Sequence, residues 1–183
     1  HRSSPDSFEL VCRGDIARYD TRIIGLAVLK GFFSLLTDDP VSYVNAPSMA
    51  KAAGIAMREV NSTDTDEYVN LITLRCTDHH SISGTLSGTR REQRIVEIDG
   101  HTFDVPPSEH MLVVTNDDRP GVIGTVGTLL GEAAINIADM DVGRAADEGI
   151  AVMLIATTGE VPADVVDRLR QSPGILSVVE LAG

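Results

Sequence analysis

The sequence has few aromatic residues, few basic residues and little cysteine. Only 4% of its 183 residues are aromatic and none is Trp, so we expect a core built from aliphatic side chains. Lys and Arg total 15 against 27 Asp and Glu, for a formal net charge of −12. Nucleic acids and anionic membranes attract basic surfaces, so this balance predicts neither as a partner.

Long hydrophobic runs are also missing. The longest apolar stretch covers residues 23–36 and is interrupted by Lys30 and two glycines, whereas a membrane-spanning helix needs about 20 apolar residues. We expect no transmembrane segment. Cys12 and Cys76 are far apart and lack CxxC spacing, which predicts buried, reduced thiols, no metal site and a cytoplasmic location.

What remains is a composition typical of a globular protein, with 43% hydrophobic and 23% charged residues. The length allows one ordinary domain or two small domains of about 80 to 100 residues each. Two prolines in a polar segment, residues 105–110, indicate a boundary. We therefore predict an α+β chain with domains at 8–105 and 109–183.

The first domain is predicted to pack helices on a mainly antiparallel sheet. Residues 8–14 alternate like a strand, and residues 19–36 carry apolar side chains at helical spacing, with Thr21 or Asp20 as the N-cap. A second short helix should have Pro47 in its first turn and Gly54 at its end. Four β-rich runs follow, the last with an Asp-Gly turn: 56–62, 67–77, 81–88 and 93–105.

The second domain has the element order βαββαβ. Two right-handed crossovers around a hairpin place both helices on one face of a four-stranded antiparallel sheet, which is a ferredoxin-like fold. The apolar run 150–156 predicts a buried central strand. The expected elements are strand 109–116, helix 120–133, strands 135–143 and 150–159, helix 162–171 and strand 175–181.

A polar loop, TNDDRPGVIG at 115–124, precedes the first helix of this domain. One apolar stripe of that helix should face the sheet; it comprises Val122, Ile123, Val126, Leu129, Leu130 and Ala133. Gly121, Gly124 and Gly127 lie off the stripe. Each glycine inside a helix costs roughly 0.5 to 1 kcal/mol relative to alanine, so we expect a ligand or a neighbouring chain to approach the backbone here.

Two interpretations of the loop fail. A nucleotide-binding turn would need GxGxxG, and Asp117 and Asp118 would repel phosphate. Catalysis would need titratable groups that converge in a pocket. The two carboxylates are adjacent in sequence, the histidines at 79, 80, 101 and 110 are expected in turns, and no GxSxG or HExxH motif is present. We assign no catalytic residue.

Recognition of a small zwitterion is the third interpretation. Asp118 and Asn116 can accept hydrogen bonds from an ammonium group, and the N–H groups of Gly121, Val122 and Ile123 at a helix N-terminus suit a carboxylate. A simpler alternative is that Asp118 only caps the helix, with Pro120 in its first turn. The residues alone leave both open.

The sequence resembles a known pair of regulatory domains. Residues 113–144 are similar to the opening of an ACT domain, the amino-acid-binding module of many biosynthetic enzymes, in the form found in D-3-phosphoglycerate dehydrogenases. Residues 13–36, 41–55 and 83–105 resemble the intervening, or allosteric substrate-binding, domain of the long form of that enzyme. The resemblance covers nearly all of residues 8–183.

The resemblance implies a site shared between two chains. In this family ACT domains pair side by side into one continuous sheet, giving a homodimer or homotetramer, and L-serine binds in the seam. Asn116 and Asp118 of one chain would then face Asn136 and Ile137 of its partner, with Pro120 to Ile123 enclosing the ligand.

The resemblance also implies an anion site in the first domain, for substrate or phosphate. Arg94 matches a basic position of the family, and Arg90, Arg91 and His101 are nearby candidates. For Arg90 and Arg91 a solvated turn is the alternative.

On this resemblance, the chain is a non-catalytic regulatory region that holds no cofactor. Its parent enzyme would use NAD to oxidise 3-phosphoglycerate at the entry to serine biosynthesis, under feedback inhibition by serine or another small amino acid. Two alternatives stay open: the regulatory part of an iron–sulphur L-serine dehydratase, and a free-standing amino-acid sensor.

Overall fold

The computed structural model describes residues 5–65, 67–77, 80–144 and 149–182. The chain divides into two compact units, residues 1–86 and 87–183. Residues 87–105, which the sequence placed with the first domain, are grouped with the second half by their contacts. The domain boundary near residues 105–109 stays a prediction.

The first unit is built around β1 (Ser7–Gly14). Strand β2 (Ala56–Ser62) pairs parallel to β1, β3 (Asn70–Cys76) pairs antiparallel to its other edge, and β4 (Ser81–Ser87) pairs antiparallel to β3. The order is therefore β2-β1-β3-β4. A mainly antiparallel sheet is what the sequence predicted.

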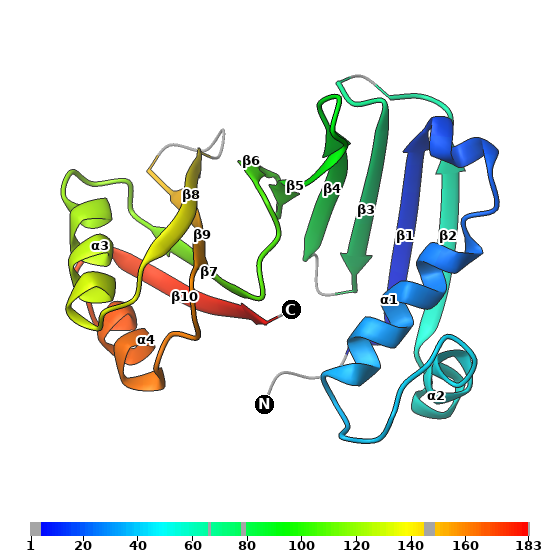
Figure 1. The fold of residues 1–183 in the computed structure, drawn as a ribbon, viewed down its shortest axis with the longest axis horizontal. Coiled ribbons are helices and arrows are strands. Elements are labelled where there is room, and N and C mark those ends of the chain that lie inside the picture. Colours follow the sequence, from blue (N-terminus) through cyan, green and yellow to red (C-terminus); the bar gives the residue numbers. More distant parts are fainter. Residues whose placement is uncertain (1–4, 66, 78–79, 145–148, 183) are drawn as a thin grey trace. The chain divides into compact units, whose positions relative to one another are not determined.

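Helices η1 (Asp15–Arg18), α1 (Arg22–Ser34) and α2 (Ala46–Ala53) follow β1, and α1 and α2 cover one face of the sheet (Figure 1). The core on this face includes Phe8, Leu29, Phe33, Ala46, Ala50 and Ile55. Gly54 ends α2 with φ of 72°, as predicted. Thr21 stands at the N-cap of α1 without a side-chain cap bond. Asp20 supplies one instead, because its Oδ1 accepts from the Arg22 amide at 3.1 Å.

The second unit begins with a hairpin of β5 (Glu92–Ile98) and β6 (His101–Val105). Asp99 and Gly100 both have positive φ, 50° and 80°, as expected for the Asp-Gly turn. The elements that follow are β7 (His110–Asn116), α3 (Val122–Glu132), β8 (Ile137–Arg144), β9 (Ala151–Thr157), α4 (Ala163–Arg170) and β10 (Ile175–Ala182).

These last six elements form the ferredoxin-like fold that the sequence predicted. The strand order is β10-β7-β9-β8 and every neighbouring pair is antiparallel. Helices α3 and α4 pack on the same face of this sheet (Figure 1). Strand β9 is buried along its whole length, which confirms the predicted central strand, although Ile150 precedes it and is 42% exposed.

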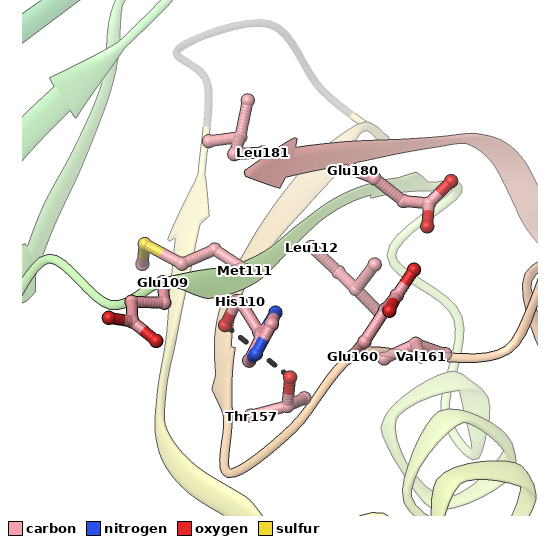
Figure 2. A pocket seen from close by; sticks show the side chains of 9 residues that line it. All are labelled: Glu109, His110, Met111, Leu112, Thr157, Glu160, Val161, Glu180 and Leu181. Atoms are coloured by element: carbon pink, nitrogen blue, oxygen red, sulfur yellow. Dashed lines mark hydrogen bonds between the residues drawn. The ribbon is translucent and has the colours of Figure 1, made fainter. Parts of the chain in front are cut away.

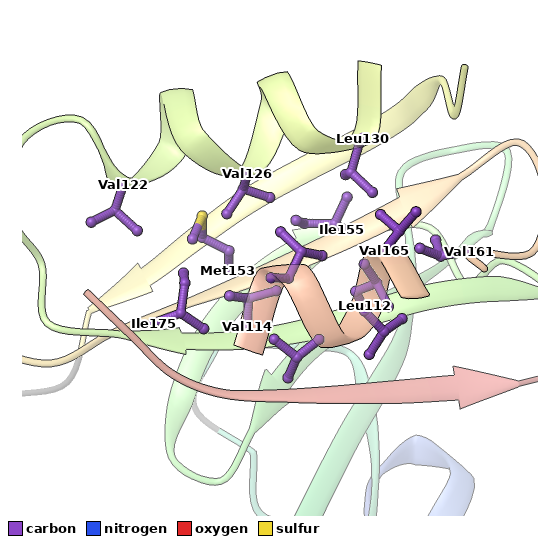
Figure 3. Close-up of a cluster of buried hydrophobic side chains, with 13 residues drawn as sticks. Leu112, Val114, Val122, Val126, Leu130, Met153, Ile155, Val161, Val165 and Ile175 are labelled. Carbon is purple, nitrogen blue, oxygen red and sulfur yellow. The ribbon is translucent and has the colours of Figure 1, made fainter. Parts of the chain in front are cut away.

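The core between helices and sheet is aliphatic, as the scarcity of aromatic residues requires. Val122, Val126 and Leu130 of α3 point toward Met153 and Ile155 of β9 (Figure 3). Burial of each such side chain contributes about 1.5 to 3 kcal/mol. Ile123 is an exception to the predicted stripe, since it is 49% exposed and faces away from this core.

The other face of this sheet contacts β6. Along β8, Met140 and Val142 pack against the core on the helix side, so Asp141 and Gly143 point to the opposite face. There the Asp104 amide donates to Oδ2 of Asp141 at 2.9 Å. A Cβ on Gly143 would lie 2.9 Å from the ring of Phe103, so only glycine allows this close approach.

Candidate functional site

The polar loop between β7 and α3 is organised by Asn116, at the end of β7. Asn116 is 3% exposed. Its Nδ2 donates to the carbonyl of Ala151 at 3.1 Å, and its Oδ1 accepts from the Asp118 amide at 3.0 Å. These bonds hold Asp118 at φ of 46°. Asn116 therefore fixes the loop, a role that the sequence did not indicate, and its direct contact with an effector stays a prediction.

Asp117 is tied into the protein. Its amide donates to the Gly174 carbonyl at 3.0 Å, and its carboxylate accepts from Nε of Arg119 at 2.5 Å and forms an ion pair with the same guanidinium. The hydrogen bond from Arg119 lowers the pKa of Asp117 below its ordinary value of 3.8. Asp117 is thus ionised and already paired, and Asp118 is the exposed carboxylate of the loop.

The start of α3 differs from the prediction in two ways. The helix begins at Val122 rather than Pro120, and its N-cap is Gly121, in a left-handed conformation with φ of 97° and no side-chain cap bond. Asp118 is therefore not the N-cap residue of α3. The Val122 amide is not free either, because it donates to the carbonyl of Arg119 at 3.4 Å.

Other amides at this helix start remain available. Among the described residues the Gly121 amide makes no backbone hydrogen bond, and Ile123 lies in the first helical turn, where amides lack an intrahelical acceptor. A carboxylate is the chemistry that such a position favours.

The outer surface of α3 is open. A Cβ added at Gly124, Gly127 or Gly131 would meet no atom within 4 Å outside the adjacent residues and the backbone of its own helix. Ile123, in the same helix, is exposed. Nothing within the described part of this chain explains three glycines in one short helix. The space agrees with the expectation that a ligand or a second chain approaches here.

Asn136 and Ile137 lie far from the loop within one chain. Strands β7 and β8 run parallel to each other, since both are antiparallel to β9. Asn116 is level with Ala151 at one end of β9, whereas Ile137 is level with Thr157 at the other end. The structure therefore brings Asn116, Asp118 and Pro120 to Ile123 together in one segment, and it places Asn136 and Ile137 at the opposite end of the sheet.

A cavity of about 310 Å³ lies at the Thr157 end of this sheet (Figure 2). Its lining includes Glu160, Glu180, His110 and Leu112. None of the eight predicted effector residues is among its lining residues. The cavity is thus separate from the loop.

The histidines that the structure describes lie in different segments of the chain. His101 and His110 begin strands β6 and β7, so the expectation that they lie in turns is wrong; His79 lies outside the described residues. Within the described ranges, no group of three or more His, Cys, Asp and Glu side chains is placed to hold a metal ion.

The predicted anion-site residues lie on and beside the β5–β6 hairpin. Arg90 and Arg94 share the carboxylate of Glu92 at 2.9 and 3.0 Å, and Arg94 also lies 3.6 Å from Asp104. Arg91 is exposed in the preceding turn with φ of 54°. An external anion would compete with Glu92 for Arg90 and Arg94.

His101, the fourth candidate, bonds through Nδ1 to the carbonyl of Asp99 at 3.2 Å. Its Nε2 is buried without a hydrogen-bond partner among the described residues. The four residues share one region of the chain, and the anion site itself stays a prediction.

Cys12 and Cys76 are thiols outside any disulfide, as predicted. Cys12 is buried but Cys76 is only partly buried, so the expectation of full burial is wrong for Cys76. Burial, and secondarily the charge of Glu59, raises the pKa of Cys12 above its ordinary value. Within the described ranges, no helix is both long enough and apolar enough to cross a bilayer.

Two family models match the chain in sequence. The D-3-phosphoglycerate dehydrogenase intervening domain matches residues 2–99, and the ACT domain matches residues 110–174. Among solved structures, the ACT domain of the GTP pyrophosphokinase of Chlorobium tepidum aligns with 39% of this chain and 95% of its own, at 18% identity and a TM-score of 0.31.

Curated relatives carry the name D-3-phosphoglycerate dehydrogenase. The Bacillus subtilis protein is 37% identical over 90% of this chain, the Methanocaldococcus jannaschii protein 34% over 96%, and the Mycobacterium leprae protein 32% over 88%. The matched segment is 32%, 33% and 31% of these relatives, so the chain spans about a third of their length. The chain belongs to the family of D-3-phosphoglycerate dehydrogenase regulatory regions, in which an intervening domain is followed by an ACT domain.

Proposed function

We propose that this chain is the amino-acid-responsive region of a D-3-phosphoglycerate dehydrogenase, and that it binds L-serine between two ACT domains. The names of the relatives support a parent enzyme that dehydrogenates D-3-phosphoglycerate. NAD as its cofactor, serine biosynthesis as its pathway and the cytoplasm as its location are part of the proposal. Serine would then be the end product that inhibits its own pathway.

The observation that carries this proposal is the separation of the two halves of the effector site. Asp118 and the α3 start lie at one end of the sheet, and Asn136 and Ile137 lie at the other. Strand β8 is the terminal strand of the sheet. If two copies pair edge to edge through β8 about a twofold axis, their β8 strands run antiparallel, and the Ile137 end of each strand approaches the loop end of its partner.

The polar groups in such a seam are complementary to the ammonium, carboxylate and hydroxyl groups of serine. The ammonium group would bond to the exposed carboxylate of Asp118, and the carboxylate would bond to the amides of Gly121 and Ile123. The Ile123 side chain would form an apolar wall. Asn136 of the partner chain would bond to the serine hydroxyl, and it is exposed at the start of β8.

Binding in a seam provides a mechanism of control. A ligand that contacts two chains favours the paired arrangement and biases the domains attached to each chain, with a coupling free energy of typically about 1 to 3 kcal/mol. Pairing through β8 would also cover an edge strand that otherwise invites aggregation. The names of the relatives favour the dehydrogenase over the L-serine dehydratase and the free-standing sensor.

Calorimetric titration of the 183-residue chain with L-serine tests the proposal. We expect one serine per chain, with glycine and D-serine binding more weakly because they lack the hydroxyl or present it in the wrong direction. Light scattering should show that serine increases the dimer fraction. As a control, the variant Asp164→Asn, which replaces an exposed acid in the first turn of α4, should bind L-serine like the unaltered chain. No heat with any of these amino acids at millimolar concentration would refute amino-acid sensing.

A further inference from the structure

The helix-free face of the first sheet carries a charged groove. Side chains alternate along β1, so Phe8 packs with the helices whereas Glu9, Val11 and Arg13 point to the other face. The groove runs over β1 and β2 and has a volume of about 410 Å³. This volume lies within the range of about 300 to 1,000 Å³ that is common for small-molecule sites.

One end of the groove is closed by an ion-pair network. Strand register places Glu9 beside Arg58 of β2 and Arg75 of β3. The Glu9 carboxylate lies 3.3 Å from Arg58 and 3.2 Å from Arg75. At this end, both guanidinium groups thus already have a carboxylate partner.

The other end of the groove carries the guanidinium group of Arg13. Arg13 is partly buried and, among the described residues, makes no ion pair and no side-chain hydrogen bond. Its neighbour in register is Ser62 of β2. The Ser62 hydroxyl accepts from the Asp64 amide at 3.1 Å, so its O–H can still donate. A guanidinium group with unused donors can bind a ligand that supplies an acceptor, and a carboxylate matches it in charge and geometry.

The floor between the two ends is apolar. Val11 is 5% exposed. Val60 lies beside it on β2. From Arg13 to Glu9 is four residues of strand, or about 13 Å, which leaves room for a short alkyl chain.

We propose that this groove binds a short-chain aliphatic monocarboxylate. Its carboxylate accepts from Arg13 and the Ser62 hydroxyl, and its alkyl chain lies over Val11 and Val60. A single negative charge fits best, because three arginines line the groove against the two carboxylates of Glu9 and Asp64, which leaves a net charge of +1. The site is distinct from the ACT seam and from the Arg90 and Arg94 cluster, so its failure would leave the proposed function intact.

The test is a titration of the 183-residue chain with sodium hexanoate at constant ionic strength, followed by ¹H–¹⁵N NMR. Saturable shifts should centre on the amides of Val11, Arg13 and Ser62. Acetate, which has the charge alone, and hexan-1-ol, which has the alkyl chain alone, should each bind at least tenfold more weakly. Equal shifts with acetate, or with sodium chloride, would overturn the proposal.

Variants separate the site from a general charge effect. Arg13→Gln should weaken hexanoate binding about tenfold or more, because a charge-assisted hydrogen bond is lost. Val60→Ser should weaken it through the apolar floor while retaining Arg13. Arg18→Gln, at an exposed arginine of η1, should bind like the unaltered chain. If Arg18→Gln has as large an effect as Arg13→Gln, or if Val60→Ser has none, the proposal is wrong.

Discussion

Two variant chains that each lack serine binding should restore it when they pair. The variants are Asp118→Asn and Asn136→Leu, one from each half of the proposed site. Asn is the better replacement at 118, since φ there is 46° and Asn tolerates the left-handed region, whereas Ala would add strain. Asn136→Leu leaves the backbone intact, including the Asn136 carbonyl that accepts from the Thr158 amide at 3.0 Å.

The expected loss in each variant follows from the group removed. Replacing Asp118 removes a hydrogen bond between charged groups, worth about 1.5 to 3 kcal/mol, or about 10- to 100-fold in affinity. Replacing Asn136 leaves a polar group of the ligand unsatisfied, at a cost of about 1 to 3 kcal/mol. At a serine concentration near the Kd of the unaltered chain, about half of its sites should be filled, whereas most sites of either variant should be empty.

Mixed dimers should behave differently because of their twofold symmetry. In a dimer of the two variants, one seam site carries both substitutions and the other carries neither. Random pairing makes half of all dimers mixed, and each mixed dimer has one intact site for its two chains. Averaged over all chains, we therefore expect about 0.25 high-affinity sites per chain. Co-expression of the two variants and calorimetry measure this fraction. Absence of recovery in dimers shown to be mixed would refute a site shared between chains.

Two further predictions concern the packing and the charges of the second unit. Gly143→Ala should destabilise the fold by about 1 to 3 kcal/mol through overpacking, because the new Cβ would lie 2.9 Å from the Phe103 ring. Denaturant unfolding measures this loss of stability, and an unchanged unfolding midpoint would contradict the close contact. Asp117 should titrate below 3.8 by NMR, because Arg119 stabilises its carboxylate. The stabilisation is complete above pH 3.8 and is lost as the pH falls through the lowered pKa; Arg119→Gln should return the midpoint toward 3.8, and a midpoint that does not move would contradict this cause.

Local signals were enough to predict most of the fold. The alternation in β1, the Asp-Gly turn and the glycine at the end of α2 each act over a few residues, so they can be recognised without tertiary information. The βαββαβ order then restricts the second half to few topologies, because crossovers are right-handed. The helix N-termini were less accurate, since capping depends on which side chain reaches which amide.

The sequence by itself determined the two kinds of domain, the aliphatic core and the segment that carries the loop chemistry, because periodicity, composition and the spacing of Gly and Pro encode them. Only the tertiary structure decided how each loop residue is used. It buried Asn116 as an anchor, paired Asp117 with Arg119 and exposed Ile123. Strand register, which sequence does not reveal, separated the loop from Ile137 by the length of the sheet. Contacts between residues distant in sequence depend on packing, so the shared site that the resemblance implied acquired its geometric reason only in the fold.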